Sequence, residues 1–147
     1  MIILAIDPGN EKSAFVFFDT VEQIILRKGI VPNMEMLDIV KVGEGDRLVI
    51  EMIACYGMPV GKEVFNTCLW IGRFIEASPD EYSLIYRREE KIFLCGSMKA
   101  KDANIRQALI DLLGKDKTKG CSKDIWAALA VAVTYAGQIV NGVNYVK

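Results

Sequence analysis

Three acidic residues of this sequence stand where a side chain can do chemistry rather than merely face solvent. Asp7 ends an apolar run of strand length, 2–7, and a Pro-Gly turn follows it directly. Glu51 lies inside a second apolar, β-branched run, and Asp124 immediately precedes the apolar segment 125–133. A carboxylate at the end of a buried element is costly unless a metal ion or hydrogen-bond donors pair with it. We therefore expect the three acids to meet in one metal-binding pocket; the alternative is three separate acids, each paired at the end of its own element.

Composition narrows the chemistry that this chain can perform. The sequence has no histidine, and its four cysteines, at 55, 68, 95 and 121, form no C-x-x-C pair. The absence of histidine excludes Ser-His-Asp and Cys-His catalysis. The scattered cysteines argue against a zinc site, and we expect them to be buried, reduced thiols. Catalysis must therefore rest on Asp, Glu, Lys or Tyr, and carboxylate oxygens suit Mg²⁺.

Length and hydropathy indicate one globular domain, 1–147. Of the 147 residues, 52% are hydrophobic and 25% are charged, which is typical of a folded chain and not of a disordered one. No apolar run approaches the ~20 residues that span a bilayer, and the first residues lack the basic segment of a signal peptide. We expect a cytoplasmic protein with no membrane association.

Charge is distributed unevenly along the chain although the net charge is only −1. Residues 1–86 hold 7 Lys and Arg against 13 Asp and Glu, whereas residues 87–124 hold 10 against 6. This asymmetry is typical of nucleic-acid enzymes, although a solvated charged face is equally consistent with it. The candidates for phosphate contacts are Lys99, Lys101, Arg106, Arg87, Arg88 and Lys91. Each of them also fits an ordinary surface position.

The elements that must position these side chains follow from hydrophobic periodicity and turn residues. The pattern predicts strands at 2–7, 13–18, 23–27, around Glu51 and at 83–87, and helices at 34–42, 63–77, 101–113 and 123–140. The segment 91–95 is ambiguous and compatible with extended structure. Early antiparallel strands followed by strand–helix alternation predict an α/β fold, a mixed five-stranded sheet with helices on both faces. Acids at the ends of its central strands would lie at the edge where such folds place their chemistry.

The order of elements and three motifs resemble the RuvC-type Holliday junction resolvases of the ribonuclease H-like nuclease superfamily. The D-P-G motif at Asp7 resembles the first catalytic strand of that family, and V-I-E ending at Glu51 resembles its second acidic position. The segment D-I-W-A-A-L-A-V-A beginning at Asp124 resembles the carboxy-terminal catalytic helix. The resemblance covers nearly the whole chain, and it departs from the family at Ala127, where a fourth acid is usual. A divergent, phage-type member fits this departure.

The resemblance implies a Mg²⁺-dependent crossover junction endodeoxyribonuclease, with Mn²⁺ as a substitute ion. It would act as a homodimer on branched DNA, in DNA recombination and repair, in a bacterial cell or a phage-infected host cell. Asp7 would bridge two ions, with Glu51 on one of them and Asp124 on the other. The helix 63–77 would lie at or near the dimer interface, although a buried helix of a monomer would look the same in sequence.

Three other functions remain open at this point. A ribonuclease H-like nuclease that processes RNA would use the same acids. A junction-binding protein with reduced or lost catalysis is consistent with Ala127. Sugar kinases and actin-like ATPases also open with D-x-G after a strand, but they need two such domains and this chain supplies one.

Overall fold

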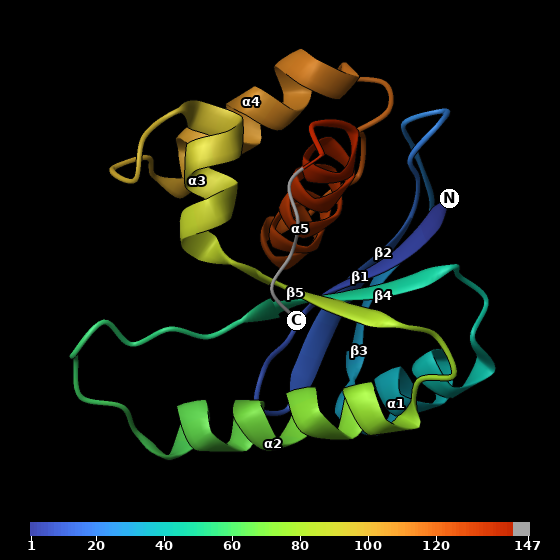
Figure 1. Ribbon diagram of the computed structural model, residues 1–147, viewed down its shortest axis with the longest axis vertical. Coiled ribbons are helices and arrows are strands. Elements are labelled where there is room, and N and C mark those ends of the chain that lie inside the picture. The colour runs from blue at the N-terminus through green and yellow to red at the C-terminus, as the bar shows by residue number, and fades with distance from the viewer. Residues whose placement is uncertain (143–147) are drawn as a thin grey trace.

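The computed structural model describes residues 1–142, which form one sheet flanked by helices (Figure 1). The strands are β1 (Ile2–Asp7), β2 (Lys12–Asp19), β3 (Ile24–Pro32), β4 (Arg47–Met52) and β5 (Tyr82–Tyr86). The helices are α1 (Asn33–Val42), α2 (Lys62–Ala77), α3 (Arg87–Cys95), α4 (Asp102–Leu113) and α5 (Lys123–Val140). The single domain expected over 1–147 stays a prediction, and residues 143–147 lie outside the described part.

The five strands form one mixed sheet in the order β3-β2-β1-β4-β5, so that β1 is central. Strand β1 pairs antiparallel with β2 and parallel with β4, and β4 pairs parallel with β5. This confirms the expected mixed five-stranded α/β fold. Because β1, β4 and β5 run in the same direction, their carboxyl ends meet at one edge of the sheet. That edge is where the first two acids lie.

Both faces of the sheet are covered because successive side chains of a strand point in opposite directions. Ile3 and Ala5 of β1 pack in a core cluster with residues of α4 and α5, whereas Leu4 and Ile6 pack with residues of α1 and α2. Figure 1 shows the same division, with α3, α4 and α5 on one side of the sheet and α1 and α2 on the other. The expected helices on both faces are therefore confirmed.

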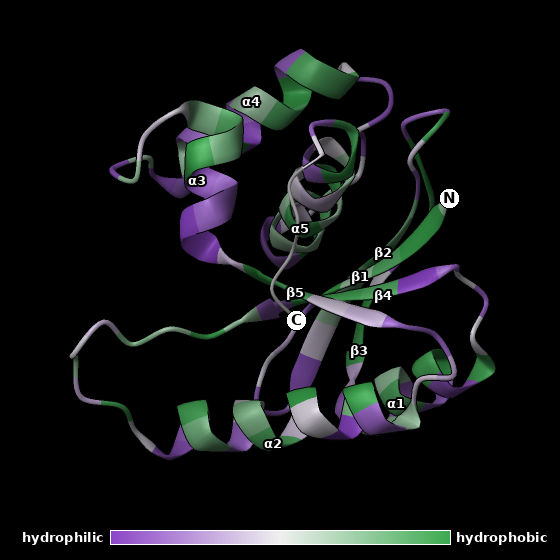
Figure 2. Ribbon diagram, in the orientation of Figure 1, coloured by the Kyte–Doolittle hydropathy of each residue, from purple (hydrophilic) through white to green (hydrophobic). Residues whose placement is uncertain are grey.

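Helix α3 begins directly after β5 and includes the segment 91–95, for which the sequence pattern was compatible with extended structure. Its start is fixed by the Glu89 carboxylate, which accepts a hydrogen bond of 2.7 Å from the backbone N–H of Tyr86. Figure 2 shows the first turns of α3 as hydrophilic. Farther along, the ring of Phe93 occupies the space that a Cβ at Gly137 of α5 would take. Close packing against α5 thus holds a helix whose sequence is only partly apolar.

The turn that follows Asp7 is held by a buried network of polar side chains. The Ser13 hydroxyl donates to Oδ1 of Asn33 at 2.6 Å and accepts from the backbone N–H of Gly9 at 3.2 Å. The Asn33 amide donates in turn to the carbonyl of Gly9 at 2.8 Å. A Cβ at Gly9 would overlap the carbonyl oxygen of Lys12, so this position requires glycine. The main chain leaving Asp7 is therefore fixed from two sides.

Two further expectations concern membranes and thiols. Among residues 1–142, no helix combines the length and the hydropathy needed to cross a membrane. All four cysteines are free, but Cys55 is exposed and the other three are only half-buried, which corrects the expectation of buried thiols. Cys55 lies in the loop after β4, which runs over the surface.

Candidate functional site

Asp7 and Glu51 leave neighbouring strands at the same edge of the sheet. Ile6 of β1 pairs with Ile50 of β4, so the residues that follow them, Asp7 and Glu51, emerge side by side. Their side chains lie on the same face as Ala5 and Val49, which is the face covered by α5, because alternate residues of a strand share a face. The register of two parallel strands thus brings together two carboxylates that are far apart in sequence.

Asp124 reaches the same place from the covering helix. It lies in the first turn of α5, where the helix dipole favours negative charge. Together with Asp7 and Glu51 it lines a pocket of about 260 Å³. The pocket is completed by Arg87, Asp102, Ile105, Arg106, Lys123, Trp126 and Ala127. The structure therefore brings the three predicted acids together, while their role as ligands remains a prediction.

The pocket disfavours the ionised form of its own acids. The pKa of Asp7 is raised to about 8, by burial most of all and then by the charges of Glu51 and Asp124, while Arg87 opposes the shift. Burial likewise raises the pKa of Glu51 to about 7, with Arg87 again opposing the shift. One oxygen of Glu51, Oε2, is buried and accepts no hydrogen bond. These carboxylates need more positive charge than the surrounding side chains supply.

Three cations share the pocket with the acids. Arg87 forms an ion pair with Asp102, and its Nη1 lies 3.5 Å from Oε1 of Glu90. The guanidinium of Arg106 lies 5.9 Å from the centre of the Trp126 ring, a cation–π distance. Lys123 is the third lining cation. Carboxylates and cations therefore line the same pocket, a combination that suits a metal-bound phosphate group.

The chemistry of the donors fits a hard divalent cation. Mg²⁺ takes carboxylate oxygens together with several waters, and at least one buried carboxylate oxygen here has no hydrogen-bond partner. Among residues 1–142, however, no three acids or thiols are already clustered tightly enough to enclose an ion. The pocket supplies the right ligand type without a preformed cage, so binding an ion requires side-chain adjustment.

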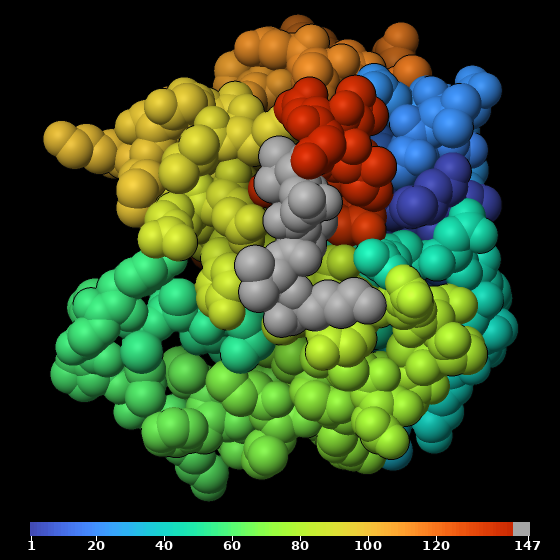
Figure 3. Space-filling view, in the orientation of Figure 1, coloured from blue at the N-terminus to red at the C-terminus, as the bar shows by residue number. Residues whose placement is uncertain are grey.

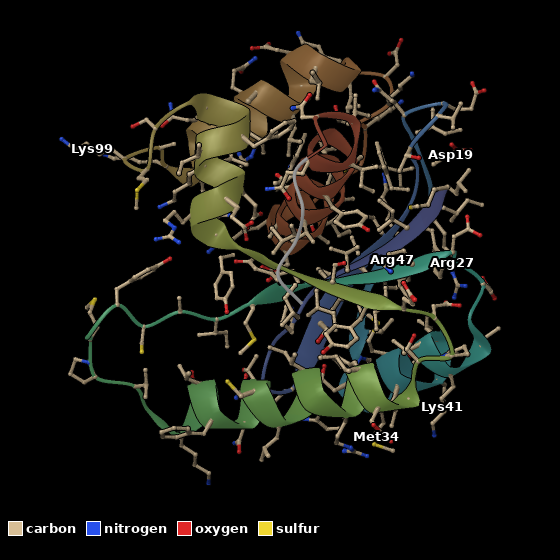
Figure 4. The ribbon with its side chains drawn as sticks, in the orientation of Figure 1. Asp19, Arg27, Met34, Lys41, Arg47 and Lys99 are labelled. Carbon is tan, nitrogen blue, oxygen red and sulfur yellow. The ribbon has the colours of Figure 1, made fainter. Side chains whose placement is uncertain are left out.

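The predicted basic residues divide into two groups. Arg87 and Arg106 line the pocket. The other four, Arg88, Lys91, Lys99 and Lys101, are not among the lining residues, and three of them are exposed. Lys99 projects from the connection between α3 and α4, away from the body of the molecule (Figure 4). A role of these six residues in DNA binding remains a prediction.

Sequence reasoning overlooked several residues of the site. Asp102, Lys123 and Trp126 line the pocket, and Glu90 lies behind it. Lys123 and Trp126 flank Asp124 closely in sequence, and that proximity was the available signal. Nothing comparable marks Asp102 or Glu90, because their approach depends on how α3 and α4 fold back over the sheet.

Comparison with solved structures identifies the fold. RuvC of Thermus thermophilus matches with a TM-score of 0.75 at 14% identity, covering 99% of this chain and 99% of that one. T. thermophilus RuvC in complex with a Holliday junction substrate gives a TM-score of 0.78 at 15% identity, covering 99% and 98% of the two chains. The chain has the RuvC-type resolvase fold. A complex of Fowlpox virus resolvase with Holliday junction DNA matches less closely, with a TM-score of 0.53 at 14% identity over 95% of this chain and 99% of that chain.

Sequence comparisons add nothing to this fold likeness. No protein-family model matches the chain, and a comparison with curated proteins finds no match. At identities of 14% and 15% the structural neighbours establish the RuvC-type fold alone. The activity must be argued from the pocket.

Proposed function

We propose that this protein is a metal-dependent, structure-selective endodeoxyribonuclease that cleaves Holliday junctions or other branched DNA. The observation that carries the proposal is the meeting of Asp7, Glu51 and Asp124 in one pocket at the edge of a RuvC-type sheet. Holliday junction DNA is the partner of two structural neighbours, T. thermophilus RuvC and Fowlpox virus resolvase. The proposal extends that class of substrate to this chain.

The three acids are the proposed holders of Mg²⁺, with Mn²⁺ as a substitute. Bound divalent ions would make a water nucleophilic near neutral pH and stabilise the leaving oxygen of a phosphodiester. Among the three, Asp7 feels the charges of both Glu51 and Asp124. Its place at the end of the central strand, under the influence of both other acids, suits a carboxylate that serves both sides of the centre.

The cations of the pocket have a separate part in the proposal. Arg87, Arg106 and Lys123 would hold phosphate oxygens beside the acids, which positions the DNA without reading its sequence. Figure 3 shows the segment 53–61 and the connection from α3 to α4 projecting on the same side, with an indented outline between them. Because Glu51 lies at the base of the first projection, we propose that DNA approaches from this side.

A homodimer is the proposed assembly, because a four-way junction offers two symmetry-related strands to cut. Helix α2 carries an apolar stripe that its own fold leaves uncovered. Phe65 and Leu69 are 59% and 67% exposed, and a Cβ at Gly72 would meet no neighbouring atom within 4 Å. These positions are four and three residues apart, so they lie on one face of the helix. A second copy of this chain is the proposed partner of that face.

The proposal is tested with four-way, flapped and linear DNA of matched sequence, in Mg²⁺, Mn²⁺ or chelator. We expect cleavage of branched DNA only with metal present. Asp7→Asn should abolish cleavage while junction binding is kept or strengthened, because the variant removes a negative charge facing phosphates. The matched control is Asp38→Asn, the same change at an exposed position of α1. Cleavage in chelator, or undiminished cleavage by Asp7→Asn, would contradict the assigned roles.

Two outcomes of the same experiment would favour the other functions. Metal-independent junction binding without any cleavage would favour a junction-binding protein that has lost catalysis. Ala127, which stands where a fourth acid is usual, is consistent with that function. Preferential cleavage of the RNA strand in an RNA–DNA duplex would favour a ribonuclease H-like activity.

A further inference from the structure

Glu90 is the most deeply buried carboxylate that the three-acid site leaves unexplained. Its side chain is 0% exposed, and neither of its carboxylate oxygens accepts a hydrogen bond. Buried carboxylates are normally paired and hydrogen-bonded, because leaving one unsatisfied costs free energy. A residue of this kind beside a polar pocket therefore calls for a functional account.

The fold places Glu90 directly behind the pocket. Glu51 of β4 pairs with Ile85 of β5, and α3 begins two residues after Ile85. Glu90 lies one turn into this helix, so its side chain returns toward the carboxyl end of β4. The pKa of Glu90 is raised to about 9, most of all by burial. The negative charges of Glu51 and Asp7 raise this pKa as well. Glu90 is thus an electrostatic neighbour of both acids.

Counting charges shows that the centre is short of positive charge. Four carboxylates line the pocket, and Glu90 behind it makes a fifth, against three lining cations. This count leaves two negative charges when all five acids are ionised, so the side chains of the pocket do not neutralise the centre by themselves. Arg87 cannot balance the set alone, because it is shared between Glu90 and Asp102.

We propose that Glu90 completes the centre formed by Asp7, Glu51 and Asp124, as a positioning residue that acts behind Glu51 to strengthen the binding of divalent cations. It would replace, from α3, the acid that α5 lacks at Ala127, a residue that lines the same pocket. The inference rests on the proposed function, because it assumes that Asp7, Glu51 and Asp124 take up metal. Carboxylates that support metal ligands from behind commonly raise metal affinity 10- to 100-fold.

A purely structural role is the competing explanation. In that case Glu90 would only hold Arg87, and its charge would be irrelevant to metal binding. Glu90→Gln separates the two explanations because glutamine keeps the size of the side chain and cannot take a negative charge when metal binds. It should fold well, since it replaces a buried carboxylate that lacks hydrogen bonds.

The test measures Mn²⁺ binding to the DNA-free protein by electron paramagnetic resonance of the free ion. We expect Glu90→Gln to weaken Mn²⁺ binding by about 10-fold or more. Glu35→Gln, the same change at an exposed position of α1, should bind like the wild type. Adding Ala127→Asp to the Glu90→Gln variant should restore tighter binding, because it returns a carboxylate to the pocket. Glu90→Asp, which retains the charge, should bind Mn²⁺ more tightly than Glu90→Gln.

The outcomes distinguish this inference from the proposed function. If Asp7→Asn loses Mn²⁺ binding while Glu90→Gln binds as tightly as the wild type, the role of Glu90 is overturned and the three-acid site stands. Equal weakening in Glu90→Asp and Glu90→Gln would also overturn it, because side-chain shape and not charge would then be decisive. If the wild type binds no Mn²⁺, or if Asp7→Asn binds it like the wild type, the proposed metal site itself fails.

Discussion

Asp7→Asn should stabilise the metal-free protein, and increasingly so as the pH rises. The pKa of Asp7 is raised from 3.8 to about 8 in the folded protein. A raised carboxyl pKa contributes stability that is fully present below the unfolded value and is lost as the pH rises through the folded value. The wild type should therefore lose stability between about pH 4 and pH 8. Asparagine, which does not titrate, should remove this part of the loss.

The size of the effect follows from the pKa shift. At pH 7 the unfolded chain has passed its pKa of 3.8 by about three units, while folded Asp7 is still largely protonated. At about 1.4 kcal/mol per unit, the upper bound is ~4 kcal/mol of folding free energy. Asp7 is partly open to solvent, which screens its charges, so we expect roughly half of this, ~2 kcal/mol.

The assay is urea unfolding in chelator at several pH values between 4 and 9. With a urea dependence of about 1–3 kcal/mol/M, ~2 kcal/mol displaces the midpoint by on the order of 1 M. The midpoints of Asp7→Asn and wild type should converge near pH 4 and separate toward pH 8. Asp38→Asn controls for loss of an exposed acid. A constant difference between Asp7→Asn and wild type across this range would refute the claim that burial and the neighbouring acids govern Asp7.

Three other changes test separate parts of the structure. Gly9→Ala should destabilise the fold by ~2 kcal/mol or more in thermal melts, because the added methyl overlaps a backbone carbonyl. Gly61→Ala is the control: it adds its methyl group to open space and should leave the stability nearly unchanged. Ala127→Asp should lower the Mg²⁺ concentration for half-maximal cleavage; a lower melting temperature with unchanged metal affinity would mean that position 127 acts as core. Leu69→Glu should convert the homodimer to monomers in sedimentation experiments, while Leu112→Glu, the same change at another exposed leucine, on α4, should not. A wild type that is monomeric at micromolar concentration yet cuts junctions symmetrically would remove the case for a dimer.

The fold and the three acids could be predicted from the sequence because local patterns, namely apolar runs, hydrophobic periodicity and turn residues, mark them. Asp7 is marked by an apolar run of strand length that it ends, Glu51 by an apolar run that encloses it, and Asp124 by the long apolar segment that follows it. If the strands that carry Asp7 and Glu51 are parallel neighbours, their carboxyl ends lie side by side, and so do the two acids. The placement of Asp7, Glu51 and Asp124 therefore needed no knowledge of loops.

The rest depended on packing that leaves no periodic signal. Helix α3 opens with R-R-E-E-K, a segment that looks solvated, yet Glu90 within it is fully buried. Its burial results from the start of the helix at the end of β5 and from contacts with α5. The basic residues are the converse case, because Arg87 and Lys99 look alike in sequence but only Arg87 reaches the pocket. The composition identified the basic segment 87–124, but it did not show which of its basic residues line the pocket.

The contact between Phe93 and Gly137 links the two walls of the pocket mechanically. Phe93 belongs to the helix that carries Glu90, and Gly137 belongs to the helix that begins beside Asp124. The ring fills the space that a Cβ at Gly137 would take, so glycine at this position lets the two helices pack closely. A side chain larger than glycine at 137 would require the Phe93 ring to move or the two helices to separate. Where the helices separate, a substitution at 137 would change the spacing of Glu90 and Asp124 without altering either residue.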